Sequence, residues 1–243
     1  MLKQNPLEFL DTFVKQSRFF IVDNNMYVLK EFASEIGLLK WYIIMVSNFA
    51  VGIYPFKLDP KERLIREVEF MRKSTKCFKK PEVLIVDYTK PKIVRSFVKG
   101  EVYSYDSPIN IHYEIGKYLG FCHEEGWVLG DTKITNFVYN EKGLFIVDAE
   151  QAIREYNEKY AAWDILVLIS TLSMDGYLKA VKSDYSRIVD FILRGYIDTH
   201  RESADVIKML RSNEFKPLIL LLIPFPLNYV FYKKIGEYVE HIY

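Results

Sequence analysis

The most informative segment of the chain reads Gly130-Asp-Thr-Lys-Ile-Thr-Asn136, followed after a short gap by Leu144-Phe-Ile-Val-Asp148. The first part is a polar loop at the start of a predicted β-hairpin, and the second is an apolar strand that ends in a carboxylate. A carboxylate at the end of a buried strand is costly in free energy unless it is paired or binds a metal. The segment therefore predicts a charged functional site.

The residue types in this segment suit phosphoryl transfer. Asn136 and Asp148 carry the hard oxygen ligands that Mg²⁺ prefers. Asp131 could accept a proton, and Lys133 could neutralise the charge of a transferring phosphate, although a lysine in a loop is more often only solvated. Since positioning and charge neutralisation do most of the catalytic work in phosphoryl transfer, the ordered set Asp131, Asn136 and Asp148 predicts that chemistry.

The spacing D-x-K-x-x-N, followed by an apolar strand that ends in Asp, resembles the catalytic loop and the metal-binding aspartate of the protein-kinase-like superfamily. A Gly-Asp pair at 130–131 makes the chain most similar to small atypical kinases, including archaeal ones: the RIO kinases, the kinase subunit of the KEOPS complex and the bacterial lipopolysaccharide-core kinases. The resemblance covers roughly residues 18–200. It implies an α+β, bilobal protein-kinase-like fold that binds ATP and Mg²⁺, with a small strand-rich N-lobe containing one main helix and a helical C-lobe.

The resemblance also implies roles for individual residues of the segment. Asp131 would orient the acceptor hydroxyl and accept its proton, while Lys133 would stabilise charge on the γ-phosphoryl group. Asn136 and Asp148 would hold the metal ion. Asp131 and Lys133 are thus the expected catalytic residues.

Two upstream segments resemble the phosphate-binding part of such kinases. Tyr27-Val-Leu-Lys-Glu-Phe32 resembles the strand that carries the phosphate-binding lysine, here Lys30. Arg63-Leu-Ile-Arg-Glu67 resembles the start of the helix that carries the carboxylate partner of this lysine, here Glu67.

Two further segments complete the resemblance. Arg95-Ser-Phe-Val-Lys-Gly-Glu101 resembles the hinge between the lobes, where Phe97 and Val98 would meet the adenine ring. Lys159-Tyr-Ala-Ala-Trp-Asp-Ile165 resembles the C-lobe helix whose buried aspartate, here Asp164, braces the catalytic loop.

The residues leave alternatives open at two positions. The side chain of Lys30 could face water, and Lys40 or Lys57 would replace it in a different strand register. Glu69 is a rival to Glu67. Side chains two residues apart point about 200° away from each other around the helix axis, so only one of the two can face the cleft. The apolar face of the helix lies closer to Glu67.

The chain departs from the kinase pattern at three places. Leu129 replaces the histidine that usually precedes the Gly-Asp pair, and the metal-binding aspartate is followed by Ala149 and Glu150 rather than Phe-Gly. No G-x-G-x-x-G motif precedes Lys30. These departures motivate an alternative function, a catalytically weak or inactive nucleotide-binding scaffold.

The acceptor cannot be read from the sequence. A serine or threonine hydroxyl on a protein is the first expectation, because Lys133 matches the kinases of that class. A sugar or another small-molecule alcohol is the next, and the KEOPS resemblance also suggests an ATPase within a multi-protein complex.

The periodicity of apolar residues predicts a boundary near Lys99–Gly100, with an N-lobe at 1–99 and a C-lobe at 100–243 that contains the catalytic loop 129–136. The N-lobe should open with a hairpin around Asp23-Asn24-Asn25, and Asp59 should cap a helix that begins at Pro60. Residues 34–50 fit a helix better than two strands. The other expected elements are strands at 81–88 and 92–98, a helix that ends at Gly126, a hairpin of 137–139 and 144–147, and helices at about 158–174, 184–211 and 215–240.

Composition sets the outer limits. The chain has 243 residues, of which 50% are hydrophobic and 27% charged, with a net charge of +1. These values exclude a disordered tail and a protein that coats nucleic acid. Residues 57–99 are rich in Lys and Arg and could meet RNA, an acidic protein or phospholipid, but a solvated lysine-rich surface is the simpler interpretation. No specific nucleic-acid contact is therefore predicted.

The expected cellular location depends on the cysteines, the N-terminus and the apolar segments of the sequence. The two cysteines, Cys77 and Cys122, make neither a disulfide framework nor a zinc-ligand spacing, which favours a reducing compartment. The N-terminus lacks the apolar core of a signal peptide. The longest apolar run, Leu218 to Ile223, is far shorter than the roughly 20 residues that span a bilayer. The segment 218–227 could dock on a membrane but is better interpreted as a buried element. A cytoplasmic protein without a transmembrane segment is expected.

Overall fold

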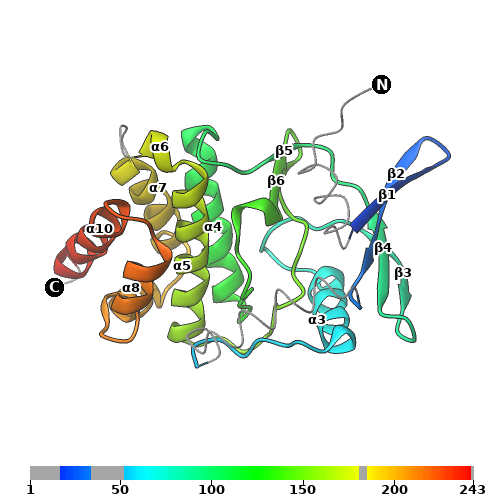
Figure 1. Cartoon of the computed structure of the whole chain (residues 1–243), viewed down its shortest axis with the longest axis horizontal. Helices are drawn as coiled ribbons and strands as arrows, with labels where there is room; N and C mark the ends of the chain where they lie inside the picture. Colours follow the sequence, from blue (N-terminus) through cyan, green and yellow to red (C-terminus); the bar gives the residue numbers. More distant parts are fainter. Residues whose placement is uncertain (1–16, 34–51, 181–184, 242–243) are drawn as a thin grey trace, which may run out of the picture.

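The protein has a mixed α+β architecture in two parts (Figure 1). The computed structural model describes residues 17–33, 52–180 and 185–241. A four-stranded antiparallel sheet and helix α3 form the N-lobe, and most of the remaining helices form the C-lobe. Strands β5 and β6 lie between them in the view of Figure 1. The expected bilobal α+β fold is confirmed.

The sheet of the N-lobe has the order β1-β2-β4-β3. Asp23 and Asn24 form its first turn with φ values of 48° and 60°, in the left-handed region that these two residue types tolerate. The predicted hairpin is therefore confirmed, and Lys30 lies on β2, between two neighbouring strands. The strands of this sheet are β1 (Ser17–Val22), β2 (Asn25–Glu31), β3 (Val83–Asp87) and β4 (Lys92–Ser96).

Helix α3 (Pro60–Arg72) begins where its sequence predicts. The Asp59 side chain accepts a hydrogen bond of 2.9 Å from the Glu62 amide, and Pro60 opens the first turn, where no amide donor is needed. One face of the helix is buried and packs against the sheet through a small apolar cluster. That packing carries Glu67 to the inner side of β2. The cluster contains Phe32, Leu64, Val68 and Ile93.

The C-lobe is built around α4, α5 and α7, with α4 packed along α7. The short 3₁₀ helix η1 ends the loop that begins at residue 129 and leads into the β6–β7 hairpin, which was expected for residues 137–147. The elements are α4 (Ile109–Glu124), η1 (Ile134–Asn136), β6 (Phe137–Asn140), β7 (Gly143–Ile146), α5 (Glu158–Asp175), α6 (Tyr177–Ala180), α7 (Tyr185–Ile197), α8 (Ser203–Arg211), α9 (Lys216–Leu222) and α10 (Leu227–His241).

The expectation of two long C-terminal helices is wrong. The first is interrupted between α7 and α8, where the Thr199 hydroxyl bonds to the carbonyls of Gly195 and Lys117 and His200 turns toward Tyr156. The second is interrupted between α9 and α10 by Pro224 and Pro226, which cannot supply a helical amide donor.

Strand β5 was not predicted from the sequence, and one predicted helix lies in a segment that the structure does not describe. Strand β5 (Glu101–Val102) pairs with β6, and two residues are too few to leave a periodic pattern. The helix expected at 34–50 lies outside the described residues.

The expectation for the cysteines is also wrong. The structure joins Cys77 and Cys122 in a disulfide between the segment after α3 and helix α4. Both residues are buried in the main apolar core, and their 45-residue separation gives no sign of pairing in the sequence. The cysteines therefore no longer argue for a reducing compartment.

The apolar segment near residue 220 is buried on one side only. Ile219 and Ile223 are fully buried, whereas Leu221 and Phe225 are largely exposed. Within the described part of the chain, every helix is too short or too polar to cross a bilayer.

The Asp59 cap gives a first test. Asp59→Ala removes the acceptor for the Glu62 amide and should lower the free energy of unfolding by about 1 kcal/mol. Asp59→Asn keeps a side-chain oxygen at the cap and serves as the matched control, with a much smaller loss. Urea denaturation followed by circular dichroism measures both, and equal stability of Asp59→Ala and the wild type would contradict the assignment.

Candidate active site

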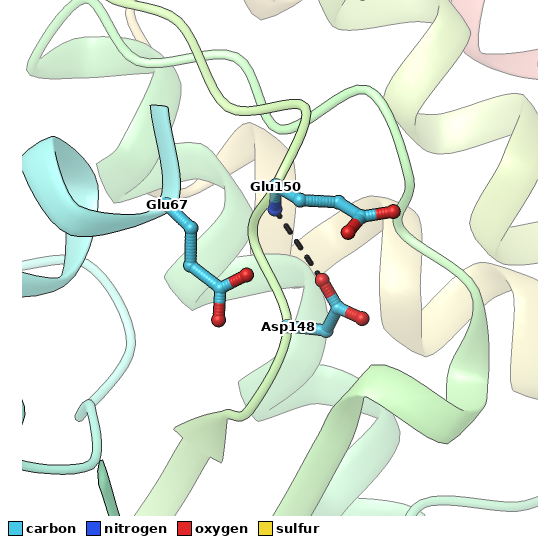
Figure 2. A group of neighbouring side chains, drawn as sticks. All are labelled: Glu67, Asp148 and Glu150. Carbon is cyan, nitrogen blue, oxygen red and sulfur yellow. Dashed lines mark hydrogen bonds between the residues drawn. The ribbon is translucent and has the colours of Figure 1, made fainter. Parts of the chain in front are cut away.

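Lys30 is the centre of a buried charge cluster. Its ammonium nitrogen lies 2.7 Å from Glu67 Oε2, 2.9 Å from Asp148 Oδ1 and 3.0 Å from Glu150 Oε2. Figure 2 shows the three carboxylates: Glu67 comes from α3, whereas Asp148 and Glu150 lie on the loop after β7. Val28 and Lys30 alternate along β2, and Phe32 continues the same pattern directly after the strand, so all three side chains point inward. Only 1% of the Lys30 side chain is exposed.

Two buried arginines balance this cluster. Arg95 Nη1 lies 3.0 Å from Glu67 Oε1, and Arg63 Nη2 lies 3.4 Å from Glu150 Oε2. Among the described residues, the cluster with Lys30 thus contains three cations and three carboxylates. Such compensation is required, since a buried charge without a partner is strongly destabilising.

The charges of the cluster determine its protonation state. Burial opposes ionisation of Asp148, yet Lys30 and Lys133 hold the pKa of its carboxyl group well below the ordinary value. Burial likewise disfavours the ammonium form of Lys30, but the surrounding carboxylates raise the pKa of this lysine above its usual range. Lys30 is therefore a cation and Asp148 an anion at neutral pH.

The loop at residues 129–136 is held by helix α5. The Asp164 carboxylate accepts hydrogen bonds of 2.7 Å from the Leu129 amide and 2.6 Å from the Gly130 amide. Trp163 Nε1 donates to the Gly130 carbonyl at 2.9 Å. His123 of α4 contacts the same carboxylate through Nε2 at 3.1 Å. Asp164 thus lies where the kinase resemblance expects the bracing aspartate.

The loop places the sequence-derived candidates close together. Lys133 Nζ lies 2.7 Å from Asp131 Oδ2, and Asn136 Nδ2 donates to the Asp131 carbonyl at 2.7 Å. The Val147 amide donates to the Asn136 carbonyl at 2.8 Å, which brings the end of β7 beside η1. Residues 131, 136 and 148 therefore lie in one region of the structure rather than on separate surfaces.

A cleft of about 450 Å³ connects this region with the proposed hinge. Phe97 and Val98 line it together with Asn136 and Asp148. The Phe97 amide donates to the Met26 carbonyl at 3.1 Å, which fixes the hinge segment to the N-lobe sheet. The expected adenine and metal contacts thus share one cavity.

The donor set of the cleft fits a hard divalent cation. Asn136 contributes an amide oxygen and Asp148 a carboxylate whose side chain is 22% exposed, so both are of the type that binds Mg²⁺. The other carboxylates near Asp148 are a different case. Glu67 and Glu150 are nearly inaccessible and face Lys30, whose ammonium group lies between them, so they bind a lysine rather than an ion.

Among the described residues, those that the sequence offered as alternatives to Lys30 and Glu67 do not join the buried cluster. Lys57 is 42% exposed and pairs with Glu62 on the surface. Glu69 faces solvent, and Lys40 lies outside the described residues. Lys30 and Glu67 are the pair that the structure brings together.

Sequence reasoning missed four residues of this region. Arg95 and Glu150 carried no recognisable signal, since their contacts join distant segments. Arg63 could have been found, because it lies one helical turn from Glu67 on the same face of α3. His123 gives no signal in the sequence, because the four histidines show no metal-ligand spacing.

Comparisons with known proteins support a kinase-like chain. No family model matches. Over 151 residues the chain is 25% identical to the KEOPS complex subunit Bud32 of Pyrococcus abyssi, an alignment that covers 58% of this chain and 66% of that protein. Over 132 residues it is 23% identical to a probable bifunctional tRNA threonylcarbamoyladenosine biosynthesis protein of Methanosarcina mazei, covering 54% of this chain and 23% of that protein. The chain thus spans less than two thirds of either relative.

A solved structure shows the same fold. The ethanolamine kinase of Plasmodium vivax superimposes with a TM-score of 0.50 and 10% sequence identity, over 97% of this chain and 83% of that one. The similarity to the protein-kinase-like superfamily that the motifs indicated is therefore confirmed for the fold.

The conformation of Gly130 gives a second test. Gly130 has a φ of +72°, and a Cβ at this position would lie 2.3 Å from the Tyr54 ring. Tyr54 cannot easily move, since its hydroxyl donates to the Gln151 carbonyl at 2.7 Å. Gly130→Ala should therefore lower the free energy of unfolding by about 2 kcal/mol or more. Gly52→Ala is the control, because an added Cβ there meets nothing within 4 Å. Equal unfolding midpoints for the two variants would refute the argument.

Proposed function

We propose that the protein is an ATP- and Mg²⁺-dependent phosphotransferase that acts on an alcohol, in the manner of an atypical serine/threonine protein kinase. The observation that carries the proposal is the shared cleft: the hinge residues Phe97 and Val98 line it together with Asn136 and Asp148. The ammonium nitrogen of Lys30 lies 2.9 Å from Asp148 Oδ1. In this proposal the N-lobe and the C-lobe meet near Lys99–Gly100.

The chain provides the groups that such a reaction needs. Lys30, held by Glu67, orients the α and β phosphates, while the backbone at Phe97 and Val98 meets the adenine ring. Asn136 and Asp148 hold Mg²⁺, which supplies charge neutralisation to the phosphates when it is bound.

Asp131 and Lys133 serve the transfer step. Asp131 orients the acceptor hydroxyl and accepts its proton, while the acceptor oxygen bonds to the γ-phosphorus and the bond from this phosphorus to the bridging oxygen of ADP breaks. Lys133 stabilises charge on the transferring group. In the present arrangement Lys133 bonds to Asp131 at 2.7 Å, so the two side chains already stand at hydrogen-bonding distance.

The acceptor is proposed to be a protein serine or threonine, since Lys133 takes the place that a lysine has in kinases of that class. A complex-bound ATPase is a further possibility, because one relative is named as a subunit of a complex. In that case a partner protein, not a phosphorylated substrate, would be the main interaction.

A nucleotide-binding scaffold is the second candidate function. The turn between β1 and β2 consists of Asp23 and Asn24 instead of a glycine-rich loop, and Ala149 and Glu150 follow Asp148. These features favour nucleotide binding with slow or absent transfer.

Asp131→Asn tests the catalytic assignment. The amide cannot accept the hydroxyl proton, so phosphotransfer should fall about 10²- to 10⁴-fold while the affinity for MgADP stays close to that of the wild type. Asp205→Asn, at an exposed position on α8, is the matched control and should keep full activity. An Asp131→Asn protein with undiminished transfer would remove Asp131 from the mechanism.

Radiolabelled ATP separates the candidate functions. A kinase should place the γ-phosphate on a protein or on a small alcohol, in a reaction that requires Mg²⁺ and is lost in Lys30→Met. An ATPase should release inorganic phosphate without labelling an acceptor. A scaffold should show a thermal shift with MgATP and neither product, and the absence of any shift would contradict all three.

A further inference from the structure

The buried ammonium group of Lys30 is surrounded by three carboxylates. It donates hydrogen bonds to Glu67 Oε2 at 2.7 Å and to Asp148 Oδ1 at 2.9 Å, and it lies 3.0 Å from Glu150 Oε2. Because these oxygens crowd the ammonium group, a phosphate oxygen that approaches Lys30 from the cleft would displace one of them.

The three carboxylates differ in how firmly they are held. The side chains of Glu67 and Glu150 are 0% and 3% exposed, whereas that of Asp148 is 22% exposed and lines the cleft. Each of the two buried glutamates also pairs with an arginine, Glu67 with Arg95 and Glu150 with Arg63. Asp148 is thus the partner that can turn away from Lys30 without leaving a charge stranded in the interior.

We propose that Glu150 is a second positioning residue for Lys30: together with Glu67 it forms a two-carboxylate cradle, and Lys30 exchanges only Asp148 for the phosphates of the nucleotide. The proposal rests on the proposed function. It gives a role to a residue that departs from the Phe-Gly of the usual kinase pattern.

Arg63 links the cradle to helix α3. It lies one turn before Glu67, donates to the Phe32 carbonyl at 3.1 Å and pairs with Glu150. Its Nε and Nη1 atoms have no hydrogen-bond partner among the described residues, although the side chain is fully buried. Glu150 is therefore the principal compensation for this charge within the described chain, and the pair ties α3 to the loop after β7.

A simpler interpretation would be that Glu150 only neutralises Arg63. The distances favour a contact with the lysine as well, since Glu150 Oε2 lies 3.0 Å from Lys30 and 3.4 Å from Arg63. A binding measurement distinguishes the two roles.

The experiment measures the dissociation constant of MgADP by isothermal titration calorimetry for the wild type, Glu150→Gln, Glu67→Gln and the double variant. Each single change should raise the dissociation constant about tenfold, and the double change should raise it by more than the product, because either carboxylate alone keeps Lys30 partly in place. Glu69→Gln, at an exposed position on the same helix, is the control and should leave the affinity unchanged.

A second variant separates positioning from charge balance. Arg63→Met with Glu150→Gln removes both buried charges, so its melting temperature should recover relative to Glu150→Gln alone. If Glu150 positions Lys30, the affinity of this double variant for MgADP stays about tenfold weaker than that of the wild type. Recovery of wild-type affinity in this variant, or a Glu150→Gln protein with unchanged affinity, would overturn the cradle while leaving the proposed function intact. A wild-type protein that binds no MgADP would overturn both.

Discussion

Lys30 carries a positive charge into the interior of the molecule, and the arrangement around it follows from the need to compensate that charge. Carboxylates reach it from α3 and from the loop after β7, so a strand, a helix and a loop from three distant parts of the sequence must meet at one point. Glu67 and Glu150 are almost fully buried beside Lys30, so removing either of them would leave part of the buried charge uncompensated. The charge cluster therefore fixes the position of α3 against the C-lobe more specifically than the small apolar cluster beneath the sheet can.

A second network fixes the other side of the cleft. Asp164 holds the amides at 129–130, and the backbone bond between Val147 and Asn136 joins η1 to the end of β7. Asp148 belongs to both networks, because it follows Val147 in the sequence and its side chain contacts Lys30. The segment 147–148 thus links the two sides of the cleft, through the hydrogen bond of the Val147 amide to Asn136 and the contact of Asp148 with Lys30.

Local signals explain which parts could be predicted. The Asp23–Asn24 turn, the start of α3 at Asp59 and the hairpin after Asn136 each depend on residues that are neighbours in sequence. The pairing of Cys77 with Cys122 and the contact of Glu150 with Lys30 depend on packing across 45 and 120 residues, for which one sequence gives no sign. The order of the site residues could be inferred from spacing, and Arg63 could have been found from its position one turn before Glu67, but the contact of Arg95 with Glu67 could not.

The missing glycine-rich loop changes how a triphosphate could be held. No glycine precedes Lys30 in the sequence, and a two-residue turn joins β1 to β2, so this turn offers few backbone amides to cover phosphate oxygens. In the part of the chain that the structure describes, the cluster around Lys30 is already balanced, with three cations against three carboxylates. Within the proposed function, the added negative charge must therefore be met from the catalytic-loop side, by Lys133 and by a cation held at Asn136 and Asp148. A divalent ion is then a requirement of the charge balance and not only an aid to the transfer step.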